Sequence, residues 1–168
     1  KEVAGRRGIR VAKWLGDGAL LVGVLPGPTV ATIAELTGRF ETISLDLRAG
    51  VASGVALLFD GDDYIGRPVN LAARLCDEAG PGELLADAGY CSDANLAAIA
   101  DTPIDAYIST RKQKHGEQRG RPGPCPRGPL PTTATRVDRM ARKLHTKTGA
   151  AVYAARKAIV EPVFGQIK

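Results

Sequence analysis

The sequence has few of the features that would assign it to a secreted, zinc-binding or membrane class. It contains one methionine and three cysteines, and 5% of its residues are aromatic. Cys76, Cys91 and Cys125 are odd in number and lack the paired short spacing of zinc sites and redox pairs, which favours a reducing, cytoplasmic setting. No apolar run approaches the roughly 20 residues needed to span a bilayer, and no charged-then-apolar leader is present. We therefore expect a chain without membrane contact.

Charge divides the chain into two parts. Residues 1–86 hold nine Lys/Arg and eleven Asp/Glu, whereas residues 87–168 hold fourteen and seven. Between positions 111 and 157 there are thirteen basic residues and two acidic ones, which is typical of a surface that faces phosphates. The alternative is a solvated or disordered basic segment. The chain begins at Lys1 rather than Met and stops at Lys168 inside an apolar-periodic stretch, so we expect both ends to be cut.

Apolar periodicity predicts an α+β or α/β fold. Two strands over 9–15 and 19–25 are joined by Gly16-Asp17-Gly18, a strong hairpin signal. A helix from Pro28 follows, with an apolar face at Ile33, Leu36, Phe40 and Ile43. The further expected elements are strands over 47–53 and 55–59, a loop over 60–66, a helix over 68–79, a strand over 83–86, a helix over 92–100, a strand over 105–110, and a helix with one face at Val137, Met140, Ala141 and Leu144. The first seven elements predict a sandwich with helices on one face of a sheet.

Residues 111–131 are expected to form a mobile basic loop. They are rich in Gly, Pro, Lys and Arg and have almost no apolar side chains, so they cannot pack a core.

Four motifs follow one another in the N-terminal half: Lys13-Trp14-Leu15-Gly16-Asp17-Gly18, then residues 47–50 (LRAG), 62–75 (DDYIGRPVNLAARL) and 80–85 (GPGELL). Together they resemble the class III adenylate/guanylate cyclase family over about residues 8–86. The resemblance implies a partial ferredoxin-like sandwich and a relation to the conversion of ATP to cyclic AMP with Mg²⁺ or Mn²⁺. A carboxylate for metal, cations for phosphates and polar groups for the purine are what this reaction requires.

The resemblance also implies roles for individual residues. Lys13 and Asp63 would contact adenine, Asp17 would bind metal, and Arg48 would contact phosphates. Asn70 and Arg74, four apart on one helix face, would orient the ribose and stabilise developing phosphate charge. Read without the resemblance, Asp17 is a turn residue, Asp63 a loop carboxylate, Lys13 a strand-edge charge and Arg74 a solvated helix residue.

The N-terminal half departs from the cyclase pattern at two places. The family's first metal-binding aspartate has no counterpart before Gly8, and its later phosphate-binding lysine is absent because the sequence changes character at Asp87. We therefore expect an incomplete site, which a partner chain or a second copy would have to complete.

The C-terminal half, from about residue 85 to 168, resembles the C-terminal part of DDE-type insertion-sequence transposases. The resemblance rests on residues 85–96, 104–108, 111–116, 127–131, 139–144 and 153–168. It implies an RNase H-like segment in which Asp87 and Glu161 are catalytic, metal-binding carboxylates, as DNA strand transfer requires. Tyr153, Arg156, Glu161 and Lys168 approximate the family's signature with one extra residue after Arg156. The expected DNA-binding residues are Arg111, Lys112, Lys114, Arg139, Arg142, Lys143, Arg156, Lys157 and Lys168.

The transposase-like half is also expected to be incomplete. Its first carboxylate is missing, because the cyclase-like piece occupies that part of the chain, and Glu161 could equally be a plain helix-end carboxylate. His115 and His145 have no partner at metal-ligand spacing, so contact with DNA or solvent is expected of them rather than catalysis.

The sequence therefore predicts a hybrid divided into residues 1–86 and 87–168 in which neither activity is complete. The alternatives are a cyclase module that works with a partner chain and a nonspecific DNA-binding protein. Both families have a strand near residues 83–87, so the halves could share it. Each half would leave uncovered apolar faces, which predicts marginal stability or self-association, including a homodimer.

Overall fold

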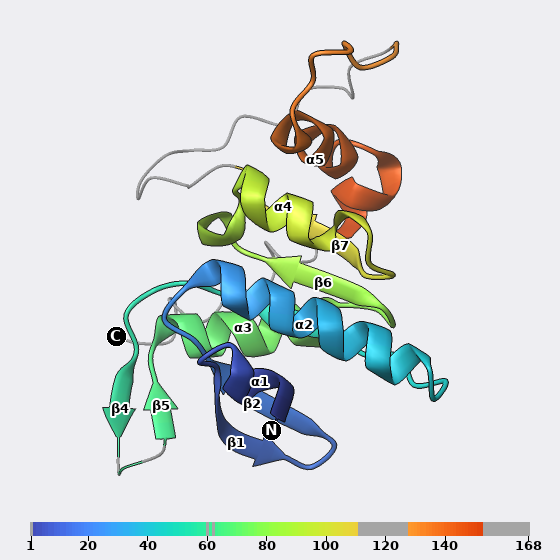
Figure 1. Ribbon diagram of the computed structural model, residues 1–168. Coiled ribbons are helices and arrows are strands. Elements are labelled where there is room, and N and C mark those ends of the chain that lie inside the picture. The colour runs from blue at the N-terminus through green and yellow to red at the C-terminus, as the bar shows by residue number, and fades with distance from the viewer. Residues whose placement is uncertain (1, 60, 62, 111–127, 153–168) are drawn as a thin grey trace.

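The centre of the fold is a three-stranded parallel sheet. The computed structural model describes residues 2–59, 61, 63–110 and 128–152 of the chain. In it β3 (Ala49–Val51), β6 (Glu83–Ala86) and β7 (Asp105–Ile108) lie in the order β3-β6-β7 (Figure 1). Ala49 pairs with Leu84, and Leu84 pairs with Ala106. The middle strand is thus hydrogen-bonded on both sides.

Helices cover both faces of this sheet. Leu84, Ala86 and Ile108 face a core shared with α2 (Pro26–Glu41), α4 (Asp93–Ala100) and α5 (Arg136–Leu144). Leu85 and Tyr107 face the opposite side, where they pack with Leu75 and Ala79 in and after α3 (Arg67–Glu78). The expectation of helices on one face was wrong. Successive strand residues point to opposite faces, and a strand reading Leu-Leu-Ala must have both faces covered.

Two antiparallel hairpins lie outside the parallel sheet. The first joins β1 (Arg10–Leu15) to β2 (Gly18–Val22), and the second joins β4 (Leu57–Phe59) to β5 (Asp63–Ile65). In the part of the chain that the structure describes, neither hairpin is hydrogen-bonded to the parallel sheet. The expected single sandwich is therefore replaced by three separate sheets. Strand β5 also corrects the expected loop over 60–66, since its Tyr64 and Ile65 pair with Leu58 and Leu57.

The N-terminal helices differ from expectation in two ways. α1 (Glu2–Arg6) was not predicted from the sequence, and its Val3 and Ala4 are buried. In α2 the buried face consists of Thr29, Val30, Thr32, Ile33, Ala34 and Thr37. Of the apolar face predicted for this helix, Ile33 is buried, whereas Ile43 lies beyond the helix end and is 62% exposed. The helix thus turns a Thr/Val/Ala stripe toward the core, because small side chains allow the close approach of α4.

Several elements confirm the sequence-based boundaries. β6 covers residues 83–86 as predicted, α3 differs by one residue at each end, and the Ser92 hydroxyl caps α4 by accepting from the Asn95 amide. α5 begins with a capping box in which Thr135 and Asp138 satisfy each other's backbone amides. Among the described residues, no helix is long and apolar enough to cross a membrane.

The parallel sheet and the main core cross the division predicted between residues 86 and 87. Strand β6 ends at Ala86, yet it pairs with β3 on one side and β7 on the other. The core that Leu84 and Ile108 enter also contains Val30 from α2 and Met140 from α5. The described chain therefore has a mixed α/β structure in which both segments contribute to one sheet. The assignment of those segments to two families stays a prediction.

Candidate functional site

Lys13 and Asp63 meet in the structure although fifty residues separate them. The Lys13 ammonium donates a hydrogen bond to the Asp63 carboxylate over 3.1 Å. Lys13 lies on β1 and Asp63 begins β5, so the contact joins the two hairpins. The two residues predicted to read a purine are therefore side by side.

Both members of this pair remain accessible to a ligand. Their side chains are 51% and 49% exposed. One Asp63 oxygen accepts from Lys13 and the other from the Tyr64 amide, which orients the carboxylate. The Lys13 ammonium has three N–H donors and one of them binds Asp63, so donors remain for a ring nitrogen of a base. An exposed pair of this kind contributes only about 0.2–1 kcal/mol to stability, so it can rearrange around a ligand at little cost.

The helix that follows β5 carries two further predicted residues. β5 leads through Gly66 into α3, which holds the exposed Asn70 in its first turn and the half-buried Arg74 one turn later. Gly66 has a φ of 148°, and a Cβ there would lie 3.2 Å from the Val55 carbonyl oxygen, so the tight strand-to-helix turn favours glycine. Asp63, Asn70 and Arg74 thus belong to one continuous strand-turn-helix unit.

Arg48 lies toward the other end of α3. It precedes β3 rather than lying within it, and its carbonyl oxygen accepts from the Cys76 thiol at 3.7 Å. Cys76 is six residues after Asn70, about 9 Å along a helix axis. The Arg48 backbone therefore contacts the C-terminal half of α3, away from the end of the helix that follows Asp63.

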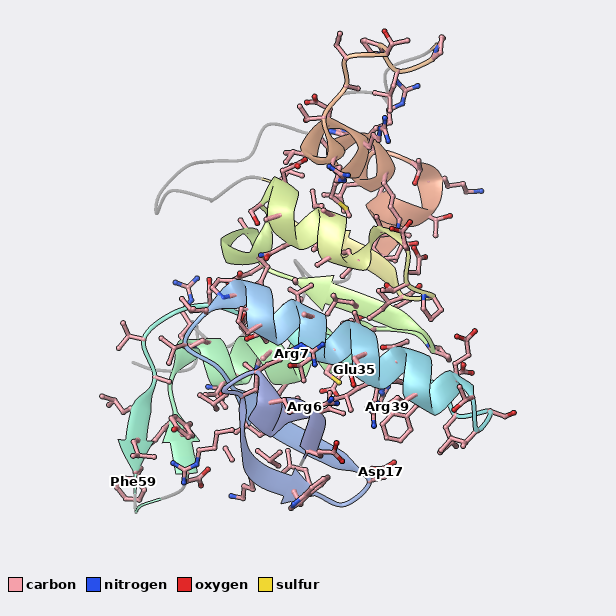
Figure 2. The ribbon with its side chains drawn as sticks, viewed as in Figure 1. Arg6, Arg7, Asp17, Glu35, Arg39 and Phe59 are labelled. Atoms are coloured by element: carbon pink, nitrogen blue, oxygen red, sulfur yellow. The ribbon has the colours of Figure 1, made fainter. Side chains whose placement is uncertain are left out.

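Asp17 lies exposed in the tight turn of the β1–β2 hairpin (Figure 2). Among the described residues there is no group of three or more His, Cys, Asp or Glu side chains that could hold a metal ion. A single turn carboxylate does not fit the carboxylate pair that the cyclase resemblance implies for Mg²⁺ or Mn²⁺.

Asp87 follows β6, as predicted, and its carboxylate is occupied by protein donors. It accepts from the Ser53 amide at 2.9 Å, from the Ser53 hydroxyl at 3.2 Å and from the Gly89 amide at 2.9 Å. Ser53 was not singled out from the sequence, because its proximity depends on the parallel pairing of β3 with β6. Asp87 therefore links the loop after β3 to the loop after β6 through these hydrogen bonds. Glu161, its predicted metal-binding partner, lies outside the described residues.

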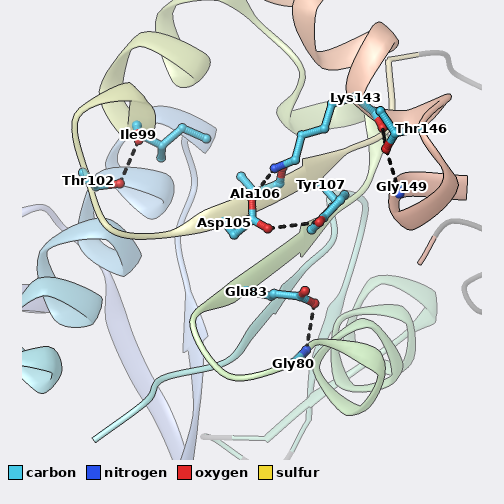
Figure 3. A network of polar contacts seen from close by, with 10 residues as sticks. All are labelled: Gly80, Glu83, Ile99, Thr102, Asp105, Ala106, Tyr107, Lys143, Thr146 and Gly149. Carbon is cyan, nitrogen blue, oxygen red and sulfur yellow. Dashed lines mark hydrogen bonds and ion pairs between the residues drawn. The ribbon is translucent and has the colours of Figure 1, made fainter. Parts of the chain in front are cut away.

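Three of the predicted DNA-binding residues lie on α5, and each has a different environment. Arg139 is exposed, Arg142 donates to the Gly128 carbonyl oxygen, and Lys143 turns toward the sheet (Figure 3). The Lys143 ammonium binds Asp105 and the Ala106 carbonyl oxygen and lies 4.1 Å from the centroid of the Tyr107 ring. Lys143 thus fastens α5 to β7. The remaining predicted DNA contacts lie outside the described residues: Arg111, Lys112, Lys114, Arg156, Lys157 and Lys168.

Comparison with known proteins relates about half of the chain to mycobacterial sequences. An 83-residue stretch, 48% of the chain, is 41% identical to uncharacterized proteins of Mycobacterium bovis and Mycobacterium tuberculosis. A 96-residue stretch, 54% of the chain, is 38% identical to a pH-sensitive adenylate cyclase of Mycobacterium tuberculosis. The matched stretch spans 22% of the length of each of these relatives. No protein-family profile matches the chain. Part of the chain is therefore similar in sequence to a protein named as an adenylate cyclase, and none of these relatives is named as a transposase.

Proposed function

We propose that the chain binds an adenine nucleotide at the Lys13–Asp63 pair and that it is a catalytically incomplete relative of nucleotide cyclases. The observation that carries the proposal is the 3.1 Å contact between these two side chains, which come from different hairpins. The similarity to a protein named as an adenylate cyclase supports the same reading.

The chemistry of the pair favours adenine over guanine. A carboxylate accepts a hydrogen bond from the exocyclic amino group of adenine, and an ammonium donates to a ring nitrogen. Guanine has a carbonyl oxygen in place of that amino group, so it would set an acceptor against Asp63. An unmade hydrogen bond of this kind costs about 1–3 kcal/mol, which corresponds to roughly 5- to 150-fold in affinity. Asn70 and Arg74, farther along the β5–α3 unit, would contact the ribose and phosphates.

The isolated chain should not form cyclic AMP. Asp17 is the one carboxylate assigned to metal in this half, and in-line attack on a phosphate needs the nucleophile and phosphates held together by more than one such group. A partner chain that supplies the missing groups is the alternative.

Calorimetric titration with MgATP and MgGTP tests this proposal. We expect weak binding with a preference for ATP, and we expect Asp63→Ala to abolish the preference. Asp77→Ala is the matched control, because Asp77 is an exposed carboxylate near the C-terminal end of α3. Equal or tighter binding of GTP, or an equal effect of the two variants, would contradict the assignment.

We propose as a second candidate function that the basic C-terminal segment, the part predicted to derive from a transposase, binds DNA without sequence preference. The observation that favours this candidate is the exposure of two basic side chains, Arg139 on α5 and Lys147 after it. Thirteen basic residues against two acidic ones between positions 111 and 157 support it further. Neutralising phosphates releases counterions, so affinity should fall with salt, by roughly a thousandfold between low and physiological salt if about six phosphates are engaged.

Binding to unrelated duplexes over a series of salt concentrations, with a manganese-dependent nicking assay beside it, tests the second candidate. We expect a steep salt dependence, similar affinities for all duplexes and no nicking. A flat salt dependence would exclude the basic segment as a DNA site. Nicking that Glu161→Ala abolishes would mean that the transposase-like site is complete.

A further inference from the structure

A pocket of about 560 Å³ lies between α5 and the segment that precedes it. Pro129, Leu130 and Pro131 line one wall, and Ala141, Arg142 and His145 of α5 and its C-cap line the other. In Figure 1 the preceding segment lies on the side of α5 that faces away from α4. The volume falls within the range of about 300–1,000 Å³ found for small-molecule sites. The pocket is distant in the fold from the hairpins that carry Lys13 and Asp63.

One hydrogen bond joins the two walls across the pocket. An Arg142 guanidinium nitrogen donates to the Gly128 carbonyl oxygen over 2.5 Å. Within the preceding segment the Ala134 amide donates to the Pro131 carbonyl oxygen over 3.0 Å, and the capping box of Thr135 and Asp138 then starts the helix.

The lining combines an apolar wall with positive charge. Proline, leucine and alanine side chains supply the apolar surface, and Arg142 and His145 supply nitrogen donors. Asp138, the one carboxylate in the lining, already accepts hydrogen bonds from the Thr135 amide at 2.9 Å and hydroxyl at 2.7 Å. Arg142 uses one nitrogen on Gly128, and a guanidinium has five N–H donors, so it can still bind an oxyanion.

We propose that this pocket binds a nucleoside monophosphate unit, with the base against the Pro129–Pro131 wall and Ala141 and the phosphate at Arg142 and His145. The unit comes either from a free nucleotide or from a single DNA strand, since both present the same base and phosphate. For the strand source, the inference rests on the DNA binding proposed for the basic segment.

Amide NMR of the full chain tests the proposal with thymidine monophosphate as the probe and thymidine as the control without a phosphate. We expect the monophosphate to shift the Ala134, Ala141 and His145 amides and thymidine to shift them much less. Ala141→Leu fills the pocket without changing charge and should weaken the binding at least about tenfold, as should Arg142→Ala. Arg139→Ala removes an equal charge from the same helix outside the pocket lining, so it should change the affinity less than about twofold.

The outcomes separate the pocket from general electrostatics and from the DNA proposal. Unshifted amides, or equal losses for Arg139→Ala and Ala141→Leu, would overturn the inference. Arg142→Ala alone would not decide it, because that variant also frees the Gly128 segment, and Ala141→Leu therefore carries the test. Competition between oligothymidylate and thymidine monophosphate assigns the pocket to a strand, and retention of monophosphate binding without competition assigns it to the free nucleotide. If salt-dependent duplex binding fails while the monophosphate still binds, the DNA proposal fails and the pocket stands.

Discussion

Glu35 on α2 is the anchor of the N-terminal helix. Its carboxylate pairs with Arg6 at 3.0 Å, with Arg39 at 2.8 Å and with Arg7 (Figure 2). A five-residue helix is too short to be stable alone, so α1 depends on such contacts and on the burial of Val3 and Ala4. The hydrogen bond from Arg7, opposed in part by partial burial and aided by Arg39, holds the pKa of the Glu35 carboxyl below its ordinary value.

We expect Glu35→Gln to loosen α1 at neutral pH. The depressed pKa means that the ionised carboxylate stabilises the fold above its ordinary pKa and that this stabilisation is lost as the pH falls through the lowered value. Hydrogen exchange of the Ile9 amide, which donates to Ala4 at 2.9 Å, reports the release. The protection factor of this amide, which corrects for the pH dependence of the intrinsic exchange rate, should fall in the variant at pH 7 and in the parent chain at acid pH. Glu41→Gln, at the exposed end of α2, should leave it unchanged, and an unchanged rate in Glu35→Gln would mean that apolar burial alone holds α1.

Tyr107 is a second residue whose ionisation is linked to folding. Burial, a hydrogen bond from its hydroxyl to Asp105 at 3.0 Å, and the charges of Asp105 and Glu83 raise the pKa of Tyr107 to about 12. Because the folded chain holds this proton more tightly than the unfolded chain, the stabilisation is complete below the ordinary tyrosine pKa of about 10 and is lost as the pH rises toward 12.

Urea unfolding at pH 8, 10 and 11 measures this contribution. The free energy of unfolding should fall with rising pH in the parent chain and fall less in Tyr107→Phe. Tyr64→Phe, on β5, is the control and should keep the parent slope. Identical slopes in the Tyr107→Phe variant and the parent would show that other groups cause the alkaline loss.

The candidate site was partly predictable at the scale of residues. The juxtaposition of Lys13 and Asp63 follows from the sequence only through the cyclase resemblance, because nothing in the forty-nine intervening residues fixes the distance between two hairpins. The contact between Ser53 and Asp87 could not be predicted from the sequence, because it depends on the parallel pairing of β3 with β6. Lys143 was expected to face DNA and instead contacts β7, since a carboxylate and an aromatic ring on that strand compete for its charge.

At the scale of elements, the packing of α3 on β3 depends on a single glycine. A Cβ on Gly50 would lie 2.2 Å from both the Ala72 carbonyl oxygen and the Cys76 amide nitrogen. These are backbone atoms of α3, so the helix itself would have to move. Gly38 in α2 is the opposite case, because a Cβ there would meet nothing within 4 Å.

Gly50→Ala should therefore lower the free energy of unfolding by about 1–3 kcal/mol, as overpacking does. Gly38→Ala should raise it by about 0.5–1 kcal/mol, since alanine restricts the unfolded chain and suits a helix interior better. Urea unfolding of both variants gives the comparison. A Gly50→Ala variant as stable as the parent would indicate that α3 does not rest on β3 in solution.

Elements with strong local signals were predicted well, and those that depend on tertiary contacts were not. α4 has a Ser92 cap and β6 a compact apolar run between Gly82 and Asp87, and both boundaries were close. α1 lacks any periodic apolar pattern and exists because Glu35 and the core hold it. The apolar pattern did not predict the buried face of α2, because Thr29, Thr32 and Thr37 are buried there. Their hydroxyls donate hydrogen bonds to carbonyl oxygens one turn back, which removes the cost of burying them.

At the scale of the whole molecule, the apolar surface is unevenly distributed. The core around the parallel sheet takes residues from α2 to α5, whereas the hairpins expose Trp14, Leu57 and Phe59 by 59%, 68% and 61%. Uncovered apolar side chains were expected in both halves, and among the described residues the exposed large ones all lie before residue 66. The parallel sheet, by contrast, has both of its faces covered by helices.

One cooperative unfolding transition should follow from the shared core, even though the sequence divides the chain near residue 86. Leu75 of α3 is 1% exposed and Ile108 of β7 is fully buried, and they lie on opposite faces of the same sheet on opposite sides of that division. Leu75→Ala and Ile108→Ala should each cost about 2–5 kcal/mol. Because β6 pairs with strands from both segments, each variant should shift the urea midpoint of amide signals in α3 and α5 by the same amount. Two separate transitions, with Leu75→Ala shifting the α3 signals alone, would instead mean that the two segments fold as independent domains.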